Sequence, residues 1–482
     1  MRIHPLDLVI VVGYLLGVTL LGIRFRQQQQ NLNDYFLGSR TAPWWALAFS
    51  IVATETSTLT IVGTPAIAYS GNMTFLQLVF GYIVGRILIT VIFLPGYFRG
   101  EYLTAYALIE RRFGAKMRSV AALTFLGTRA LAEGVRVSAI ALVISVALGT
   151  SERLAVLIVI ALTIFYTFEG GMKAVIWTDV AQFLVYLAGS LVTLALLFHR
   201  IPGGWPEISQ VAASSNKFQI LDFSTSLATK YTFWSGVIGG TFLTLATHGT
   251  DQTIVQRLLA ARNQSDSRRA LVASGFIVLV QFTVFLLVGI LLFVFSLHTP
   301  LLAAGERTDR ILPLFLVHEM PIGLAGLLLA AILAAAMSNA SGSLNSLAAS
   351  SVLDLQAFRG RTTDPAHFLK IARRMTLLWG AVLIFFALKN WGELLEAGLT
   401  LLSLPYGSLL GLFLLGTFDK RATAKASLIG MFVGFILILL IYRFTTVAFT
   451  WYFLIGSVIT FAVGALLSRV IPSGHTEPPA SP

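Results

Sequence analysis

Apolar stretches long enough to cross a lipid bilayer recur along this chain from one end almost to the other. Of its 482 residues, 56% are hydrophobic and 12% are charged, about half the charged share of a typical soluble domain. A helical span needs about 20 apolar residues. The sequence therefore predicts an all-α polytopic membrane protein with about thirteen transmembrane helices, at 6–23, 44–69, 73–95, 118–148, 154–168, 174–198, 233–247, 269–297, 322–351, 375–388, 394–418, 423–441 and 450–468.

The basic residues indicate how the chain is oriented. With the N-terminus outside, 22 of the 34 lysines and arginines fall in cytoplasmic segments and 9 in external ones, and Arg86, Arg129 and Arg136 remain within spans. This asymmetry follows the positive-inside rule, so the net charge of +12 reports topology and not nucleic-acid binding. We expect an integral multi-pass protein of a bacterial inner or cell membrane, with its C-terminus in the cytoplasm.

Two of the predicted spans are interrupted by polar residues. The second carries a run of hydroxyl and acidic side chains at Thr54–Thr60, followed by Gly63–Pro65, and the seventh is broken near Thr247–Thr250. Five spans separate the starts of the two, as an inverted repeat of five helices requires. Broken helices at matching positions of two halves indicate the binding site of a transporter.

Residues 166–182 read YTFEGGMKAVIWTDVAQ and place Asp179 inside an otherwise apolar helix. This motif resembles the signature of the sodium/solute symporters, the relatives of the sodium/glucose and sodium/proline cotransporters. LTAYALIERRFG at 103–114, GTDQTIVQRLLAA at 249–261 and AAAMSNASGSLNS at 334–346 are also similar to segments of that family. The resemblance implies a leucine-transporter-like core of five plus five helices with two broken helices.

The resemblance also implies how the chain is divided. We expect an N-terminal extra helix and loop at 1–30, a transport core at 31–420, two C-terminal helices at 421–470 and a disordered tail at 471–482. Within the core, the first repeat covers about 43–200 and the second about 233–418.

If the sodium ligands of the family are transferred to the matching positions of this chain, one sodium site would use five residues. These are the backbone carbonyls of Ala53, Thr56 and Ala335, the hydroxyl of Ser338 and the side chain of Asn339. An unwound helix turn supplies the free carbonyls that a hard cation needs in lipid. Family members carry Ser or Thr where this chain has Asn339, whose amide oxygen is still a competent ligand, so we expect a retained site of altered affinity.

Some members of the family that this chain resembles have a second sodium site. Here it would be formed by Asp179 with Ser338 and Ser341, which lie about one turn apart on one helix face. A further position of that site is Gly342 instead of serine, so coupling to one or to two sodium ions stays open. The alternatives are a structural role for Asp179 and close helix packing for the small residues.

Charged residues within the predicted spans are candidates for contact with the solute. Glu55 could contact a solute, take a proton or pair with an arginine of the fourth predicted helix, where Arg129, Glu133 and Arg136 share one face. Arg129 and Glu133 could also simply pair with each other. We expect Glu55 to face the central cavity within reach of Arg136. The arginine that binds a carboxylate in certain family members falls at Ala132 here and is not carried over.

Four further residues around the breaks are expected to face the solute: Ser57, Thr60, Thr244 and His248. His248 could relay protons, although a histidine at a helix end more often forms a hydrogen bond. The hexose-binding pattern of glucose-type members is absent, because a glutamine is missing near Thr60 and an asparagine and a tyrosine are missing near Thr244 and Ala246. A charged or zwitterionic solute is favoured over a plain hexose.

These features predict a sodium-coupled symporter that takes up a small polar organic solute by alternating access. No nucleotide-binding loop, HExxH motif or supported Ser/His/Asp set indicates an enzyme, and no cofactor beyond Na⁺ as coupling ion is expected. The expected partners are the solute, sodium ions and the lipid bilayer, with no nucleic acid. The alternatives are a proton-coupled transporter of the same fold, a non-transporting solute sensor or an ion channel; the solute and the oligomeric state are not determined by the sequence.

Overall fold

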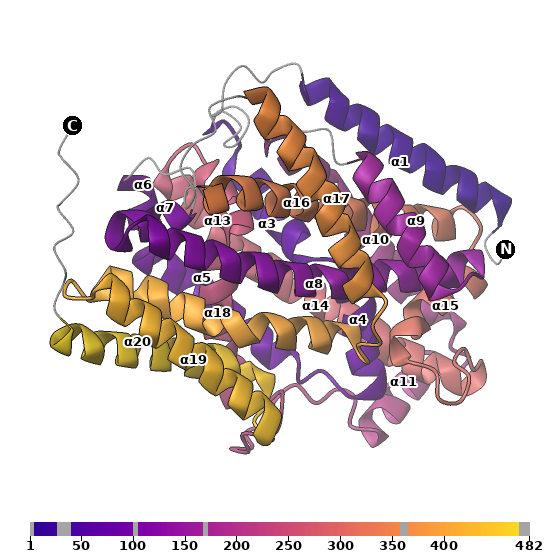
Figure 1. Ribbon diagram of the computed structural model, residues 1–482. Helices are drawn as coiled ribbons and strands as arrows, with labels where there is room; N and C mark the ends of the chain where they lie inside the picture. Colours follow the sequence, from indigo (N-terminus) through magenta and orange to yellow (C-terminus); the bar gives the residue numbers. More distant parts are fainter. Residues whose placement is uncertain (1–3, 27–39, 100–104, 167–171, 357–364, 472–482) are drawn as a thin grey trace.

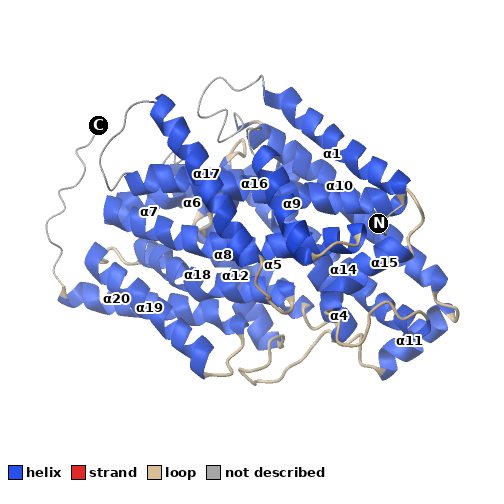
Figure 2. Ribbon diagram, turned by 45° about the vertical axis from the view of Figure 1, so that its right-hand side comes forward, coloured by secondary structure: helices blue, strands red, loops and turns tan. Residues whose placement is uncertain are grey.

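The computed structural model describes residues 4–26, 40–99, 105–166, 172–356 and 365–471, and this part of the chain is helical with no β-strand (Figure 2). Its elements are α1 (Pro5–Arg26), α3 (Trp44–Glu55), α4 (Thr58–Ser70), α5 (Leu76–Ile92), α6 (Leu94–Arg99), α7 (Ala105–Phe113), α8 (Ala115–Leu148), α9 (Glu152–Tyr166), α10 (Met172–Arg200), α11 (Gly204–Ser214), the π-helical turn η2 (Ser235–Gly239), α12 (Gly240–Gly249), α13 (Gln252–Leu259), α14 (Gln264–His298), η3 (Thr308–Arg310), α15 (Ile311–His318), α16 (Leu324–Gln356), α17 (Pro365–Ala387), α18 (Leu394–Phe418), α19 (Ala424–Phe444), η4 (Phe449–Trp451) and α20 (Tyr452–Val470).

Helices lie at all of the predicted spans. Among the described residues, seven helices are long and apolar enough to cross a membrane, and the count rises to eight if the bent pair α3 and α4 forms one span. The all-helical polytopic architecture is therefore confirmed, while the count of thirteen stays a prediction. Residues 472–482, most of the predicted tail, lie outside the described part of the chain.

The first predicted break is present. Helix α3 ends at Glu55, α4 begins at Thr58, and the two are bent by 68°. Thr56 and Ser57 between them have extended backbone, and the amide of Thr60 bonds to the carbonyl of Ser57 and not to that of Thr56, four residues back. The turn therefore frees carbonyl groups that an uninterrupted helix would use.

The second predicted break is also present. Helix α12 ends at Gly249 and α13 begins at Gln252. Asp251 caps α13, because its Oδ1 accepts a hydrogen bond from the amide of Thr253 at 2.7 Å. The carboxylate thus satisfies one of the amides that a helix start leaves free.

Two groups of helices surround the breaks. Helix α12 packs along α5, and α14 packs against both α3 and α4. On the other side, α8 packs against α9, α16, α17 and α18. Helices α19 and α20 lie at one edge of the molecule and α1 at the opposite edge (Figure 1). The broken helices are therefore surrounded by α5 and α14, and α8 and α16 pack against α4 as well.

The segment after α11 covers one end of α4. The buried Lys217 donates from Nζ to the carbonyl of Tyr69 in the last turn of α4 at 2.6 Å, and it lies 4.0 Å from the ring centroid of Phe293. Burial lowers the pKa of this lysine. A cation at the C-terminal end of a helix complements the helix dipole, so this segment fixes one end of the first broken helix.

Replacing Gly85 tests the close contact between α5 and α12. An added Cβ would lie 2.6 Å from Cβ of Thr244 and 2.8 Å from the carbonyl oxygen of Thr241. We expect Gly85→Ala to destabilise the protein by about 1–3 kcal/mol through overpacking. Thermal unfolding in detergent measures this. The control is Gly127→Ala in α8, where an added Cβ has nothing within 4 Å; equal melting temperatures of the two variants would contradict the prediction.

Candidate ion and solute site

Three charged or titratable residues meet beside the first break. Glu55, the last residue of α3, forms an ion pair with Arg86 of α5, whose side chain is 0% exposed. Nη2 of Arg86 also lies 3.2 Å from Nε2 of His248 in α12, and that nitrogen is 3.5 Å from Oε2 of Glu55. This cluster joins the first broken helix to the second.

The expected pairing of Glu55 with Arg136 was wrong. Arg136 contacts Oε2 of Glu133 at 3.2 Å on its own helix, and Glu55 is neutralised by Arg86. The sequence does contain a signal for Arg86, because a charge in the middle of an apolar span needs a partner. The spacing within one span does not say which neighbouring helix supplies that partner.

Both ring nitrogens of His248 have polar neighbours. A guanidinium can only donate hydrogen bonds, so a hydrogen bond from Arg86 to Nε2 of His248 requires the tautomer with its proton on Nδ1. Nδ1 lies 2.9 Å from the hydroxyl of Thr247, which in turn donates to the carbonyl of Leu243 at 2.9 Å. The hydrogen-bonding role expected for this histidine agrees with these contacts.

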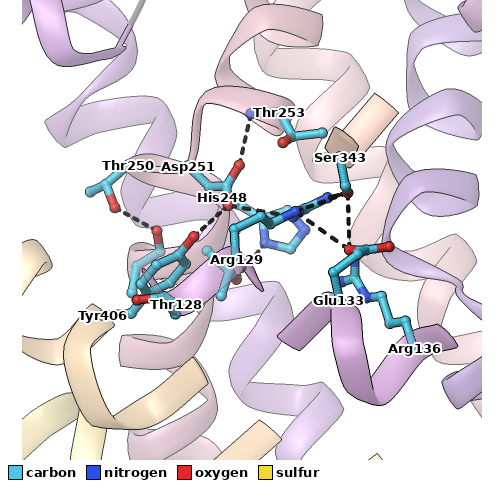
Figure 3. A network of polar contacts seen from close by, with 12 residues as sticks. Thr128, Arg129, Glu133, Arg136, His248, Thr250, Asp251, Thr253, Ser343 and Tyr406 are labelled. Atoms are coloured by element: carbon cyan, nitrogen blue, oxygen red, sulfur yellow. Dashed lines mark hydrogen bonds and ion pairs between the residues drawn. The ribbon is translucent and has the colours of Figure 1, made fainter. Parts of the chain in front are cut away.

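A second buried network connects α8 with α13, α16 and α18 (Figure 3). Arg129 donates from Nε and Nη2 to the hydroxyl of Ser343, at 3.1 and 2.7 Å, and that hydroxyl donates to Oε2 of Glu133 at 2.9 Å. Nη1 of Arg129 lies 3.9 Å from Oδ2 of Asp251, which accepts from the hydroxyl of Tyr406 at 2.8 Å. Arg129 and Glu133 thus also contact each other, at 3.6 Å, inside a larger network that spacing alone does not predict.

Asp179 is bonded to groups from two other helices. Its Oδ2 accepts from the hydroxyl of Ser50 in α3 at 2.7 Å and from Nη2 of Arg257 in α13 at 3.1 Å. Arg257 also donates to that serine at 3.1 Å. The two predicted partners in a second sodium site, Ser338 and Ser341, lie on α16, but their side chains are outside the described part, so that site stays a prediction.

The residues predicted for the first sodium site lie on two elements. Ala53 and Thr56 are at the first break, where the hydroxyl of Thr56 accepts from Nε2 of Gln281 in α14 at 2.7 Å. Asn339 lies half-buried on α16, and α16 packs against α4. The side chains of Ala335 and Ser338 are not among those described. This ligand set is therefore untested.

The predicted solute-facing hydroxyls differ in their surroundings. Ser57 and Thr60 are buried at the first break, beside Glu55. Thr244 is fully buried against Gly85 of α5, and its hydroxyl has no hydrogen-bond partner among the described residues. The break itself therefore brings together the acid and two of the hydroxyls, and Thr244 lies behind them against α5.

A cavity lies between α4, α10, α14, α15 and α16. Its lining is mostly apolar and comprises Ile61, Pro65, Tyr186, Ser190, Thr193, Phe285, Val288, Leu312, Leu316, Leu328 and Ile332. The hydroxyl of Tyr186, buried there, makes no hydrogen bond within the described chain. This cavity holds no charged group and is a poor site for a charged solute.

Comparison with known proteins gives matches over nearly the whole chain. A sequence model of the sodium:solute symporter family matches residues 35–434. The chain is 31% identical to the sodium/sialic acid symporter SiaT of Proteus mirabilis, covering 97% of this chain and 96% of that protein. It is 30% identical to the sodium/sialic acid symporter NanT of Aliivibrio fischeri, with 96% and 92% covered, and 31% identical to the human sodium/iodide cotransporter, with 85% and 64% covered.

Solved structures give the same result for the fold. The substrate-bound outward-open state of a Na⁺-coupled sialic acid symporter aligns with a TM-score of 0.86 and 30% identity, covering 98% of this chain and 99% of that one. The transporter Mhp1 aligns with a TM-score of 0.61 at 12% identity, over 92% and 95% of the two chains, which concerns the fold alone. The predicted leucine-transporter-like fold is confirmed.

The pair of Glu55 and Arg86 can be tested by a double-mutant cycle. Removing one member leaves a buried unpaired charge, so Glu55→Gln and Arg86→Gln should each destabilise by about 3–5 kcal/mol. The double variant should lose less than the sum of the two single losses. Thermal unfolding of the purified protein measures all three.

The matched control for this cycle is the more exposed pair of Glu110 and Arg118, 2.6 Å apart. Glu110→Gln should cost no more than about 1 kcal/mol. Strict additivity of the two single changes at Glu55 and Arg86 would show that the two residues do not depend on each other.

Proposed function

Because this chain belongs to the sodium:solute symporter family and is a sodium-coupled symporter of a small polar organic solute, we propose that its solute is a carboxylated sugar of the sialic acid type. The carboxylate is bound by Arg136, and the hydroxyls of the solute are bound at the first break by Glu55, Ser57 and Thr60. Sodium binding at the same break drives uptake by alternating access.

The accessibility of Arg136 carries this proposal. Arg86 is fully buried and paired with Glu55, Arg129 is held by Ser343 and two carboxylates, and Arg257 is held by Asp179 and Ser50. Arg136 has one ion pair, and its side chain is 16% exposed. A guanidinium binds a carboxylate through two parallel hydrogen bonds, and this one has donors left for an incoming anion.

The charge balance of the core supports coupling of an anion to sodium. Around the two breaks the described chain carries four arginines and four carboxylates. They are Arg86, Arg129, Arg136, Arg257, Glu55, Glu133, Asp179 and Asp251. A monoanionic solute adds one uncompensated negative charge to this neutral set, and charge is costly at membrane depth. A sodium ion bound at the neighbouring carbonyls restores neutrality, so the two ligands favour each other's binding.

The relatives support an acidic solute that also carries hydroxyl groups. The names of the two bacterial relatives specify sialic acid, and that of the human relative specifies iodide, so all three are named for anions. Glu55 is 15% exposed in its side chain, and a carboxylate accepts hydrogen bonds from hydroxyl groups. His248 and Thr244 complete the solute site behind it.

For sodium, the proposed ligands are the carbonyls of Ala53, Thr56 and Ala335 with the side chains of Ser338 and Asn339. A second ion would bind Asp179 with Ser341 and Ser338. Because Arg257 is bonded to Asp179 here, a second sodium would have to share or displace that guanidinium. The number of coupled ions therefore depends on this arginine.

The membrane arrangement is also part of the proposal. The chain is an integral multi-pass membrane protein, and the distribution of basic residues supports an external N-terminus and a cytoplasmic C-terminus. We place the transport core at 31–420, after the extra helix at 1–30 and before the C-terminal helices at 421–470.

Replacing Arg136 tests the solute assignment. Arg136→Lys keeps the charge but loses the bidentate geometry, so the solute concentration for half-maximal uptake should rise about tenfold or more, with the sodium requirement little changed. Uptake of radiolabelled N-acetylneuraminic acid into proteoliposomes measures both. Arg153→Gln, at an exposed arginine of α9, is the control and should leave both values unchanged. An unaltered half-saturation in Arg136→Lys would remove Arg136 from the solute site.

Replacing Ser338 tests the ion assignment. Uptake should require an inward sodium gradient, and Ser338→Ala should raise the sodium concentration for half-maximal uptake because one ligand oxygen is lost. Sodium titrations in proteoliposomes measure this, and a thermal-unfolding profile like that of the unmodified protein shows that the variant is folded. Full uptake driven by a proton gradient without sodium would favour the proton-coupled alternative.

A further inference from the structure

A buried carboxylate of the N-terminal helix α1 forms hydrogen bonds with the start of α16. Asp7, near the start of α1, is 2% exposed. Its Oδ1 accepts hydrogen bonds from the backbone amides of Gly323 at 2.6 Å and Gly326 at 2.8 Å. These residues lie immediately before and within the first turn of α16 (Leu324–Gln356). A residue more than 300 positions away therefore caps this helix.

The chain before α16 satisfies only part of the start of this helix, because the amides of Leu324 and Ala325 bond to the carbonyl of Pro321. A helix normally takes its cap from the side chain of the residue before its first turn, but here that residue is Gly323, with φ +92°. This left-handed backbone conformation favours glycine, which has no capping side chain. Asp7 supplies the acceptor for the amides of Gly323 and Gly326 and places a negative charge at the positive end of the helix dipole.

The contact between the two helices leaves no room for adjustment. A Cβ added at Gly326 would lie 2.6 Å from both Cα and the carbonyl oxygen of Asp7. The backbone of α1 therefore touches the first turn of α16 directly. Hydrogen bonds and close packing together fix the position of α16 along its own axis.

Helix α1 also packs against α10. Helices α10 and α16 pack against each other as well, where Gly189 of α10 faces Leu328 of α16. Helix α10 carries Asp179, and α16 carries Ser338, Asn339 and Ser341. Thus α1, which lies outside the five-plus-five core, braces the two helices whose residues are proposed to hold sodium.

We propose that Asp7 is a positioning residue for sodium binding. By holding the start of α16 against α1, it sets the position of the α16 oxygens relative to the first break and to Asp179. This inference rests on the proposed sodium ligands of α16. It gives the N-terminal helix a role in ion affinity that its place outside the repeat does not suggest.

The experiment compares three variants of the full chain in proteoliposomes. Asp7→Ala removes the cap, Asp7→Asn keeps an acceptor oxygen at the same position, and Asp7→Glu keeps the charge but lengthens the side chain by one carbon. Val9→Ala, at a residue of α1 that is 66% exposed, is the control. Sodium and solute titrations of uptake and thermal unfolding are measured for each.

We expect Asp7→Ala to raise the sodium concentration for half-maximal uptake about three- to tenfold, with the maximal rate at saturating sodium close to that of the unmodified protein. Asp7→Asn should restore most of the sodium affinity, and Asp7→Glu should raise the half-saturation value because α16 has no room to shift. If Asp7→Ala does not fold, the sodium titration of Asp7→Glu tests the inference in its place. Val9→Ala should change nothing.

A lowered melting temperature or maximal rate with unchanged sodium half-saturation, in both Asp7→Ala and Asp7→Glu, would make Asp7 a purely structural cap and overturn the inference. Failure of the proposed function would look different. In that case the unmodified protein would show no sodium dependence, or Ser338→Ala would leave its sodium titration unchanged.

Discussion

Charge pairing inside an apolar bundle is the constraint on which the core depends. Four arginines and four carboxylates lie buried or nearly buried around two helix breaks, where a charge without a partner costs several kcal/mol. Every one of them contacts an opposite charge from the same set. Most of these contacts join different helices. The core is therefore electrically neutral at each site only when its helices are arranged in this way. Moving a helix means finding another partner for its charge.

This condition applies most directly to α13. Asp251 at its start contacts Arg129 of α8, and Arg257 in its last turn is bonded to Asp179 of α10. The short helix is therefore bound at both ends, through charges of opposite sign, to two different helices. It cannot swing outward by itself, because both pairs would open together. Alternating access at this end of the molecule requires water or an ion to take the place of each lost partner.

The sequence predicts the elements of this core better than their contacts. Polar runs within apolar spans locate both breaks, because hydroxyl and acidic side chains are too costly in lipid to lie there without a function. The pairing of Arg129 with Glu133 follows from spacing on one helix. The pairing of Glu55 with Arg86 does not, because helical periodicity gives the face of a residue and not the neighbour opposite it. Asp7 is missed for the same reason, since an acid near the start of a span looks like an ordinary interfacial residue.

The proposed assignment places both ligands on one short unwound segment. Ala53 and Thr56 offer carbonyls to sodium, and Glu55 and Ser57 face the solute, so neighbouring residues in the chain serve different ligands. An unwound turn has few internal hydrogen bonds to hold it, and ordering it costs conformational entropy. Binding of the first ligand is weakened by the loss of this conformational entropy. The second ligand then binds to a turn that is already ordered. Coupling between sodium and solute then arises from the shared turn as well as from their opposite charges, and by linkage each ligand must raise the affinity of the other by the same factor.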